Sequence, residues 1–308
     1  MLQLVRLRGP HTVYDPIRYL LRSSGKRVRP VLTVLACEAV GGRAAAALDA
    51  AAAIEALHGF TLVHDDIMDN ADTRRGLQTI HRKWNDNVAI LAGDEMIALA
   101  YHSLLKTKTR KLAILLRMFT EAFIEVCEGQ GLDNEFERRL GVSLREYLHM
   151  IDKKTAKMIS TAAALGAMIG GGSKQEVNAL GTYGEQLGRA FQIQDDLLDI
   201  VADELSFGKS IGGDLKQGKK TYLLLRGIER TRGKERRLLE KVARRSRISI
   251  EEVRKIKEIF ERHGIIDEAQ ALVRNHTRRA QQALAGLGPT RAKEMLALFA
   301  DELVARTS

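Results

Sequence analysis

The sequence predicts an all-α fold, and three features of the chain indicate it. The chain has four prolines in 308 residues, and none of them lies between residues 31 and 288. Alanine-rich runs, such as residues 44–56 and 161–167, favour helix because alanine has the highest intrinsic helix propensity. The alternation of apolar and polar residues that is typical of strands is hard to find in this stretch. We therefore expect a large helical bundle with a sizeable buried core.

Helix starts and loops can also be placed from the sequence. Three serines stand three residues before a glutamate at the head of an apolar stretch, which is the pattern of a capping box: Ser143 with Glu146, Ser173 with Glu176 and Ser249 with Glu252. Glycine or charged residues cluster in residues 106–111, 129–134, 170–173 and 207–220, and we expect loops there. Because no linker composition separates these segments, we expect a single domain over residues 1–308.

Composition narrows the class of protein. The formal net charge is +10, but the basic run at residues 230–247 has no aromatic residues that could stack on bases. We interpret that run as a solvated helical face and expect no nucleic-acid partner. Cys37 and Cys127 stand in apolar surroundings, which favours buried thiols in a reducing compartment over a disulfide. The sequence indicates no secretory signal and no apolar run of membrane length, so we expect a cytoplasmic protein without an integral membrane segment.

Two clusters of aspartates carry the strongest functional signal. Residues 65–69 read DDIMD and residues 195–199 read DDLLD, 130 positions apart (195 minus 65). Like charges three or four positions apart on a helix repel, and a bound divalent cation is the simplest compensating charge. Oxygen ligands favour magnesium, manganese or calcium, and magnesium commonly combines one or two carboxylates with substrate phosphates. The clusters therefore indicate metals that bridge the protein to a phosphorylated ligand; the alternative is that each cluster is a helix end or a solvated face.

Basic segments near these clusters have the composition of phosphate sites. In the turn of residues 25–30, Lys26 and Arg29 could reach one anion together. Arg74 and Arg75 follow the first cluster by one to two helical turns, and Lys154 and Thr155 lie on an apolar helix. A glycine-rich basic loop occupies residues 208–220, but it has neither the Walker A nor the GxGxxG pattern.

Together these motifs resemble the trans-isoprenyl diphosphate synthases, the short-chain polyprenyl synthetases. The resemblance covers about residues 14–225 in order and spacing, including the Phe191–Gln194 segment directly before the second cluster. It implies an all-helical fold of the isoprenoid synthase type around a central cavity. It also implies head-to-tail condensation of an allylic diphosphate with isopentenyl diphosphate, assisted by magnesium, and a homodimer. The apolar stretch of residues 112–126 offers weak support for the dimer.

The resemblance also implies a role for each matching residue, with magnesium ions (three per site, manganese as a substitute) on the allylic diphosphate. The metal ligands would be Asp65, Asp69 and Asp195, with Asp66, Asp196 and Asp199 behind them or on a third ion. The allylic diphosphate would be held by Arg74, Lys154 and Lys209, and isopentenyl diphosphate by Lys26, Arg29, His58 and Arg75. Lys219 would lie near the loop that closes the site, and Thr155 and Gln192 beside the developing carbocation.

Product length is expected to depend on side chains that precede the first cluster, namely Ile54, Leu57, Phe60 and Thr61. In the family, a single aromatic at the fourth or fifth residue before the first aspartate suits twenty carbons, so we expect geranylgeranyl diphosphate. At about 100° per residue, however, Thr61 lies more nearly beneath Asp65 than Phe60 does. The alternatives are a farnesyl product, a product of twenty-five or more carbons, a class I terpene cyclase, and a non-catalytic subunit of a synthase.

Overall fold

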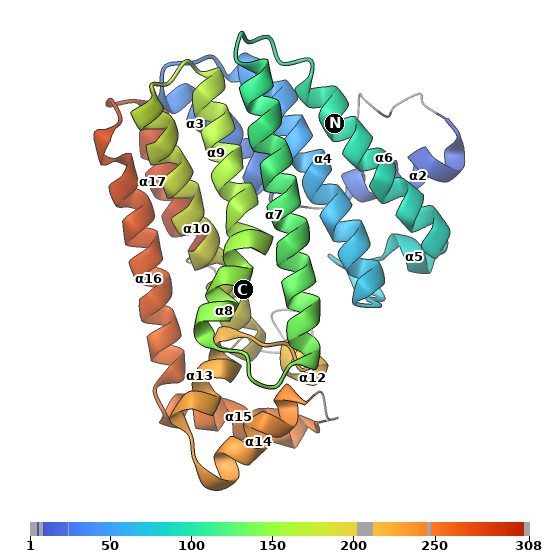
Figure 1. Cartoon of the computed structure of the whole chain (residues 1–308), viewed down its shortest axis with the longest axis vertical. Coiled ribbons are helices and arrows are strands. Elements are labelled where there is room, and N and C mark those ends of the chain that lie inside the picture. Colours follow the sequence, from blue (N-terminus) through green and yellow to red (C-terminus); the bar gives the residue numbers. More distant parts are fainter. Residues whose placement is uncertain (1–4, 6–8, 24, 202–211, 245–247, 305–308) are drawn as a thin grey trace. The chain divides into compact units, whose positions relative to one another are not determined.

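The computed structural model describes residues 5, 9–23, 25–201, 212–244 and 248–304. Nearly all of its secondary structure is helical, which confirms the predicted fold class (Figure 1). The helices in the first half of the chain are α2 (His11–Arg22), α3 (Val28–Ala39), α4 (Ala44–Met68), α5 (Ile80–Lys83), α6 (Asp86–Leu104), α7 (Leu112–Arg138) and α8 (Leu144–Ile151). They are followed by η1 (Asp152–Ala156), α9 (Lys157–Ile169), α10 (Lys174–Val201), α12 (Gly213–Gln217), α13 (Tyr222–Arg230), α14 (Gly233–Ala243), α15 (Ile250–Arg262), α16 (Ile265–Ala283), η2 (Leu284–Gly286) and α17 (Arg291–Val304).

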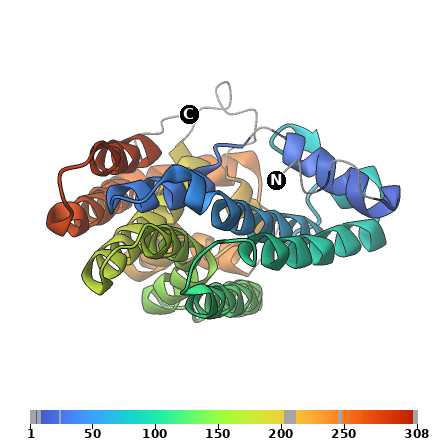
Figure 2. The same cartoon turned by 90° about the horizontal axis from the view of Figure 1, so that it is seen from above.

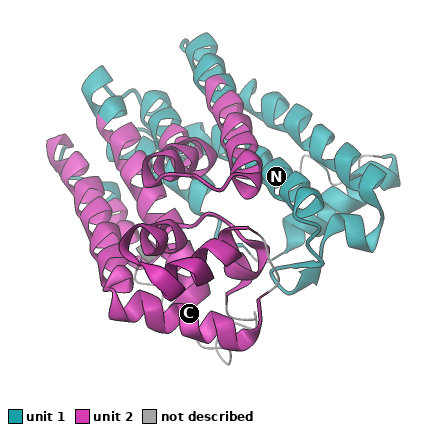
Figure 3. Cartoon of the chain, turned by 60° about the horizontal axis from the view of Figure 1, so that its bottom comes forward, with its two compact units in different colours: residues 1–120, 162–178, 288–293 teal, residues 121–161, 179–287, 294–308 magenta. Residues whose placement is uncertain are grey.

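The chain divides into two compact units (Figure 3). Unit 1 comprises Met1–Thr120, Ala162–Asn178 and Gly288–Lys293, and unit 2 comprises Glu121–Thr161, Ala179–Leu287 and Glu294–Ser308. The first aspartate cluster belongs to unit 1 and the second to unit 2. The expectation of a single domain stays a prediction.

In unit 1, the long helix α4 packs against α3 and α6; α4 and α6 lie side by side in both orientations (Figures 1 and 2). Two glycines allow the close approach of these helices. A Cβ atom added at Gly59 would collide with the Met96 side chain, and one added at Gly93 would collide with the ring of His64. Ile54 and Leu57 on α4 are fully buried, so this helix forms the centre of the core of unit 1.

Helix α4 bears on the expectation that the chain has no apolar run of membrane length. That expectation is wrong for α4, which is long and apolar enough to cross a membrane by length and composition alone. However, 61% of its most apolar window is buried inside the protein, and this is the pattern of the core helix of a soluble protein.

In unit 2, α13 packs against α8, α14, α15 and α16. Fully buried side chains such as Phe260 and Leu224 form the core between them. Close to this core, the helix that starts at Leu144 widens from α8 into one π-helical turn, η1, and then continues as α9. Single π turns of this kind are rare and often occur at functional sites.

The predicted helix starts are confirmed. The capping boxes of Ser143 and Ser249 are complete, and the Ser173 hydroxyl and the Glu176 carboxylate exchange the corresponding bonds with each other's backbone N–H. Loops occur as predicted near residues 106–111 and 170–173.

Three expectations need correction or restriction. Residues 129–134 lie within α7 and form no loop; Gly129 of that segment allows close packing against the backbone of Lys153 and Lys154. Residues 213–217 of the fourth predicted loop form α12, and its residues 207–211 lie outside the described part of the chain. Cys37 is buried as expected, whereas Cys127 is exposed.

Candidate functional site

The first aspartate cluster lies at the carboxyl end of α4. The N–H of Asp69, the residue that caps this helix, donates to the carbonyl oxygen of Asp65 at 2.8 Å. Negative charge is unfavourable at this end, since the last carbonyl groups of a helix already carry partial negative charge. A cluster that served only to cap a helix would be expected at an amino end. Its position therefore argues for a positive partner.

Asp66 of the cluster pairs with an arginine of unit 1. Asp66 is 3% exposed and accepts a hydrogen bond from Arg74 Nε at 2.7 Å. Burial raises the pKa of Asp66, and the neighbouring guanidinium opposes this rise. Asp65 and Asp69 on the same helix end are only half-buried.

Arg74 is positioned by a hairpin that follows α4. Strands β1 (Thr73–Arg74) and β2 (Leu77–Gln78) pair antiparallel, with Arg74 opposite Leu77. Arg75 and Gly76 form the two-residue connection, and both have positive φ (54° and 76°). This is the backbone of a type I′ turn, whose twist matches that of the strands. The hairpin thus holds Arg74 against Asp66 and places Arg75 at its tip.

The basic turn of residues 25–30 contacts both the hairpin and α4. A Cβ atom on Gly25 would collide with the guanidinium of Arg75. Arg27 has a left-handed backbone (φ 48°), forms an ion pair with the buried Glu55 and donates to the carbonyl oxygen of Leu21 at 2.7 Å. Arg27 is therefore a structural residue.

Arg29, in the first turn of α3, contacts His58 on α4, with 3.1 Å between Arg29 Nη1 and His58 Nε2. Burial lowers the pKa of His58 well below its ordinary value, and Arg29, Arg75, Arg74 and Arg27 lower it further. The ring is therefore neutral, and its Nε2 accepts from Arg29. The Nδ1 atom of His58 is buried without a hydrogen-bond partner among the described residues. In this tautomer Nδ1 carries a proton, so an anionic oxygen would satisfy it.

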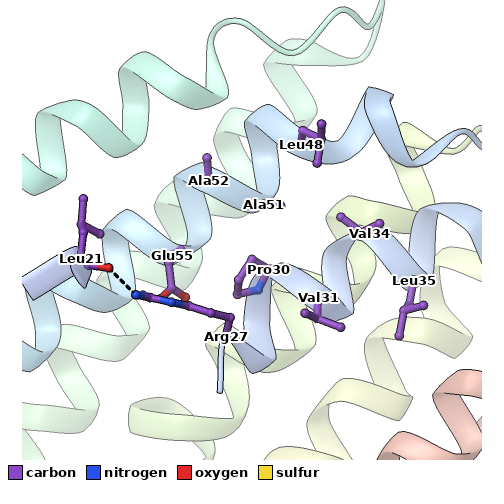
Figure 4. A pocket seen from close by; sticks show the side chains of 10 residues that line it. All are labelled: Leu21, Arg27, Pro30, Val31, Val34, Leu35, Leu48, Ala51, Ala52 and Glu55. Carbon is purple, nitrogen blue, oxygen red and sulfur yellow. Dashed lines mark hydrogen bonds and ion pairs between the residues drawn. The ribbon is translucent and has the colours of Figure 1, made fainter. Parts of the chain in front are cut away.

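A pocket of about 540 Å³ opens on unit 1 (Figure 4). Its lining is mostly apolar and includes the Arg27–Glu55 ion pair: Leu21, Arg27, Pro30, Val31, Val34, Leu35, Leu48, Ala51, Ala52 and Glu55. On α4 it is lined by Leu48, Ala51, Ala52 and Glu55, and its lining includes none of Ile54, Leu57, Phe60 and Thr61. The pocket therefore does not coincide with the positions predicted to control product length.

Those four positions differ in burial. Ile54 and Leu57 are fully buried, and Phe60 is 8% exposed and packs its edge against the ring of His64. Thr61 is half-buried, and its hydroxyl donates to the carbonyl oxygen of His58 at 2.8 Å. Phe60 is thus held by a histidine that the sequence analysis did not include in the site.

The second cluster lies in the last two turns of α10. Asp196 is 4% exposed and accepts three hydrogen bonds: from Tyr147 Oη at 2.7 Å, from Gln192 Nε2 at 3.1 Å and from the backbone N–H of Tyr222 at 3.1 Å. Burial raises the pKa of Asp196 to about 7, and the nearby carboxylate of Asp214 contributes. Asp195, by contrast, is exposed. The middle aspartate of each cluster is therefore bound within its own unit, while the first is more accessible.

Asp199, the last member of the second cluster, faces the start of α12. Its carboxylate oxygens accept the backbone N–H groups of Gly213 and Asp214 at 3.1 and 3.0 Å. Lys219 is half-buried in the turn after α12, and the neighbouring Lys220 is buried and donates to the carbonyl oxygen of Ala243 at 2.5 Å. Lys209 lies outside the described residues.

Lys154 and Thr155 lie in the π turn η1. Lys154 Nζ lies 2.5 Å from Asp133 Oδ2, and the Thr155 hydroxyl donates to Gln192 Oε1 at 2.8 Å. The π turn fits because glycines face it. A Cβ atom at Gly129 would lie 2.7 Å from Lys154 Cα, and one at Gly188 would lie 2.5 Å from Ala156 Cα.

Sequence reasoning missed Tyr147, Asp133 and the π turn. One signal for Tyr147 was available, since it stands seven residues before Lys154 and so shares a helix face with it. No sequence pattern indicated the π turn.

The donor sets fit a hard divalent cation. Both clusters offer carboxylate oxygens, the ligands that magnesium and manganese prefer. Within the described ranges, no three His, Cys, Asp or Glu side chains form a group that could hold an ion by themselves. Magnesium does not need such a group, because it often takes one or two carboxylates and completes its shell with water and phosphate oxygens.

Comparison with known proteins identifies the family. The family model described as polyprenyl synthetase matches residues 10–261. This match covers most of the chain, and the chain belongs to the polyprenyl synthetase family. The predicted family and the predicted enzyme class, a trans-prenyltransferase, are thereby confirmed.

Relatives and solved structures agree with this family. A short chain isoprenyl diphosphate synthase from Methanothermobacter thermautotrophicus is 41% identical over 298 residues, which is 96% of this chain and 91% of the relative. A geranylgeranyl diphosphate synthase from Methanosarcina mazei is 42% identical over 74% of this chain and 71% of its own. The structure of a geranylgeranyl pyrophosphate synthetase from Pyrococcus horikoshii superposes with a TM-score of 0.94 at 36% identity, covering 99% of this chain and 93% of the other. A polyprenyl synthase from Caulobacter crescentus, solved with calcium and isoprenyl diphosphate, gives 0.91 at 30% identity and covers 99% and 94%.

Proposed function

We propose that this protein condenses an allylic diphosphate with isopentenyl diphosphate head to tail and releases geranylgeranyl diphosphate, a product of twenty carbons. The names of the Methanosarcina mazei and Pyrococcus horikoshii proteins support this product. The observation that carries the proposal is the shared construction of the two clusters. In each, a buried middle carboxylate is held by protein donors, and the first carboxylate is left more accessible. This is an arrangement suited to presenting oxygen ligands to a metal-bound diphosphate.

We propose that Asp65, Asp69 and Asp195 ligate magnesium, three ions per site with manganese as a substitute, with Asp66, Asp196 and Asp199 supporting them. Bound magnesium would supply positive charge to a diphosphate that leaves with extra negative charge. The structure of the Caulobacter crescentus protein with calcium and isoprenyl diphosphate supports a divalent ion and a diphosphate ligand in this family.

The basic side chains divide between the two substrates in this proposal. Arg74, Lys154 and Lys209 hold the allylic diphosphate, while Lys26, Arg29, His58 and Arg75 hold isopentenyl diphosphate. Lys219 lies near the loop that closes the site. The protonated Nδ1 of the neutral His58 is suited to a phosphate oxygen, because an imidazole N–H without an acceptor is costly to bury.

The chemistry needs no side-chain nucleophile. The bond between the allylic carbon and the diphosphate oxygen breaks, the cation adds to the double bond of isopentenyl diphosphate, and a proton is lost to the departing diphosphate. Thr155 and Gln192 lie beside the cation, and preorganised charge with exclusion of water lowers the barrier.

A turnover assay with a chromatographic readout tests the proposal. Purified protein is supplied with magnesium, isopentenyl diphosphate and farnesyl, geranyl or dimethylallyl diphosphate, and the dephosphorylated products are separated by chain length. We expect twenty carbons and no product with a chelator present. A farnesyl or twenty-five-carbon product would refute the chain length but keep the reaction. Cyclic hydrocarbons without consumption of isopentenyl diphosphate would favour a terpene cyclase, and no turnover would favour a non-catalytic subunit.

We further propose a homodimer in the cytoplasm. Ile90 and Leu91 on α6 and Ile114 on α7 are 40% or more exposed, which is apolar surface that a second copy would cover. Light scattering should give the mass of two chains, and Leu91→Glu should shift it toward one. Ile250→Glu, which changes an equally exposed residue of α15, is the control. A single-chain mass for the wild type at micromolar concentration would refute the dimer.

A further inference from the structure

Four groups in unit 2 form a row of hydrogen bonds with a fixed direction. The Thr155 hydroxyl donates to Gln192 Oε1 at 2.8 Å, and Gln192 Nε2 donates to Asp196 Oδ1 at 3.1 Å. Asp196 Oδ2 accepts from the Tyr147 hydroxyl at 2.7 Å and from the backbone N–H of Tyr222 at 3.1 Å. The row begins at the π turn and ends at a buried carboxylate.

The carboxylate determines the orientation of the whole row. Gln192 Nε2 donates to Asp196 Oδ1, so the amide of Gln192 turns its NH₂ group toward Asp196. Its carbonyl oxygen then faces Thr155, and the Thr155 hydroxyl must be the donor in that contact. A reversed amide would place two acceptor oxygens against each other at Asp196. In the observed orientation, the Thr155 oxygen keeps its lone pairs for an electron-poor partner.

Tyr147 is the side chain that holds this carboxylate from the far side. It is 1% exposed, and its ring packs edge-on against Tyr222 with 6.4 Å between the ring centres. The ring is therefore fixed, and its hydroxyl fixes Asp196 Oδ2. With that donor removed, the carboxylate could rotate about its own axis and share its oxygens differently between Gln192 and the backbone of Tyr222.

We propose that Tyr147 is a positioning residue for prenyl transfer: through Asp196 it fixes the amide of Gln192 and so the direction of the Thr155 hydroxyl. The inference rests on the proposed function, in which Thr155 and Gln192 lie beside the carbocation. Tyr147 does not touch the substrate. It sets the orientation of groups that stabilise positive charge, and it limits capture of the cation by water.

Tyr147→Phe removes only the hydroxyl, and Tyr183→Phe is its matched control. Tyr183 is also fully buried in unit 2, and its hydroxyl also donates one bond of 2.7 Å, to the carbonyl oxygen of Leu296. Both variants lose a buried hydrogen bond, so a general loss of stability should affect both alike. Circular dichroism and thermal unfolding would show whether each remains folded at the assay temperature.

The kinetic readouts separate positioning from a structural role. Tyr147→Phe should lower kcat about tenfold with little change in KM for isopentenyl diphosphate, as expected when a supporting hydrogen bond is lost. It should also raise the fraction of allylic substrate released as prenyl alcohol. In a Gln192→Ala background, Tyr147→Phe should have almost no further effect, because the amide through which it acts is gone. The inference would be overturned if Tyr147→Phe lowered kcat by the same factor in the Gln192→Ala background as in the wild type. It would also be overturned if Tyr183→Phe lowered kcat as much as Tyr147→Phe does.

A second measurement does not depend on activity. The side-chain NH₂ signals of Gln192, assigned by their absence in Gln192→Ala, should exchange with water several-fold faster in Tyr147→Phe than in the wild type or Tyr183→Phe. If the wild type makes no prenyl product, the proposed function fails, while this measurement still decides whether Tyr147 holds Gln192. An unchanged exchange rate in Tyr147→Phe would refute the inference whatever the activity.

Discussion

The guanidinium of Arg29 and the imidazole of His58 are in contact, with 3.1 Å between Arg29 Nη1 and His58 Nε2. The contact joins a basic turn to the helix that ends in the first aspartate cluster. It requires a neutral ring, and burial ensures one by lowering the pKa of His58, which the guanidinium groups around it lower further. A neutral histidine adds no charge of its own among the arginines. Its Nδ1–H adds one hydrogen-bond donor beside their positive charges.

Replacement of His58 should affect one substrate more than the other. His58→Ala removes the acceptor that orients Arg29 and the Nδ1–H donor, so we expect KM for isopentenyl diphosphate to rise about tenfold. The KM for the allylic substrate should change little. Steady-state kinetics with each substrate varied in turn would measure both values. His149→Ala, at an exposed histidine of α8, should change neither; an equal rise in both constants would contradict the assignment.

The first aspartate cluster allows a test within a single helix. Asp65→Ala removes a proposed metal ligand and should abolish most turnover without loss of helical content, whereas Asp49→Ala, four turns earlier on α4, should retain it. Magnesium and a diphosphate together should raise the melting temperature of the wild type and of Asp49→Ala, because ligands that bind the folded state stabilise it. A similar shift in Asp65→Ala would argue against this ligand.

Much of the fold was predictable because its signals are local. The capping boxes at Ser143 and Ser249 depend only on residues three positions apart. Helix α4 is predicted by a proline-free, alanine-rich run, whatever its packing partners are. The loop predicted at residues 129–134 is wrong, although glycine breaks helices on average. Here Gly129 is required in a helix, where it lets α7 approach the π turn.

The site was predictable only in part. The aspartate clusters and their basic neighbours can be recognised by residue type. Which of these side chains bind each other depends on contacts between segments that are distant in the sequence. Asp66 is bound by Arg74 and Asp196 by Tyr147, 49 positions away, and neither spacing marks such a pair. Likewise, Arg27 binds Glu55 whereas Arg29 binds His58, and no pattern in the sequence separates these two arginines.

A buried histidine should make stability depend on pH. His276 on α16 is 7% exposed and donates from Nδ1 to Gln186 Oε1 at 2.8 Å. Burial lowers its pKa to about 4; Arg189 and Arg279 lower it further and Asp152 opposes them. Because the folded pKa lies below the unfolded value of about 6.5, the unfolded state takes up a proton first as the pH falls. This histidine should therefore cost stability progressively between about pH 6.5 and pH 4.

The expected loss at pH 5 is on the order of 1 kcal/mol after allowance for solvent screening. Thermal unfolding at pH 7 and pH 5 would measure it as a fall in melting temperature. His276→Gln should show a smaller fall between the two pH values, even if it is less stable at both. The same change at the exposed His149 should leave the difference as in the wild type, and an unchanged difference in His276→Gln would exclude this histidine as the cause.

Phe60 provides a test of product length. Its ring lies 4.7 Å from that of His64, at 69°, and the His64 ring lies against Gly93 of α6, so a histidine held between two helices packs against Phe60. If Phe60 limits the growing chain, Phe60→Ala should open a cavity and lengthen the product beyond twenty carbons, at a stability cost of about 3–5 kcal/mol.

Thr61→Phe should shorten the product toward fifteen carbons if position 61 also faces the chain, as ideal helix geometry suggests. Chromatography of the dephosphorylated products, at a temperature where both variants are folded, would decide between the two positions. An unchanged length in Phe60→Ala would place the limit deeper, at Leu57 or Ile54, or on another helix.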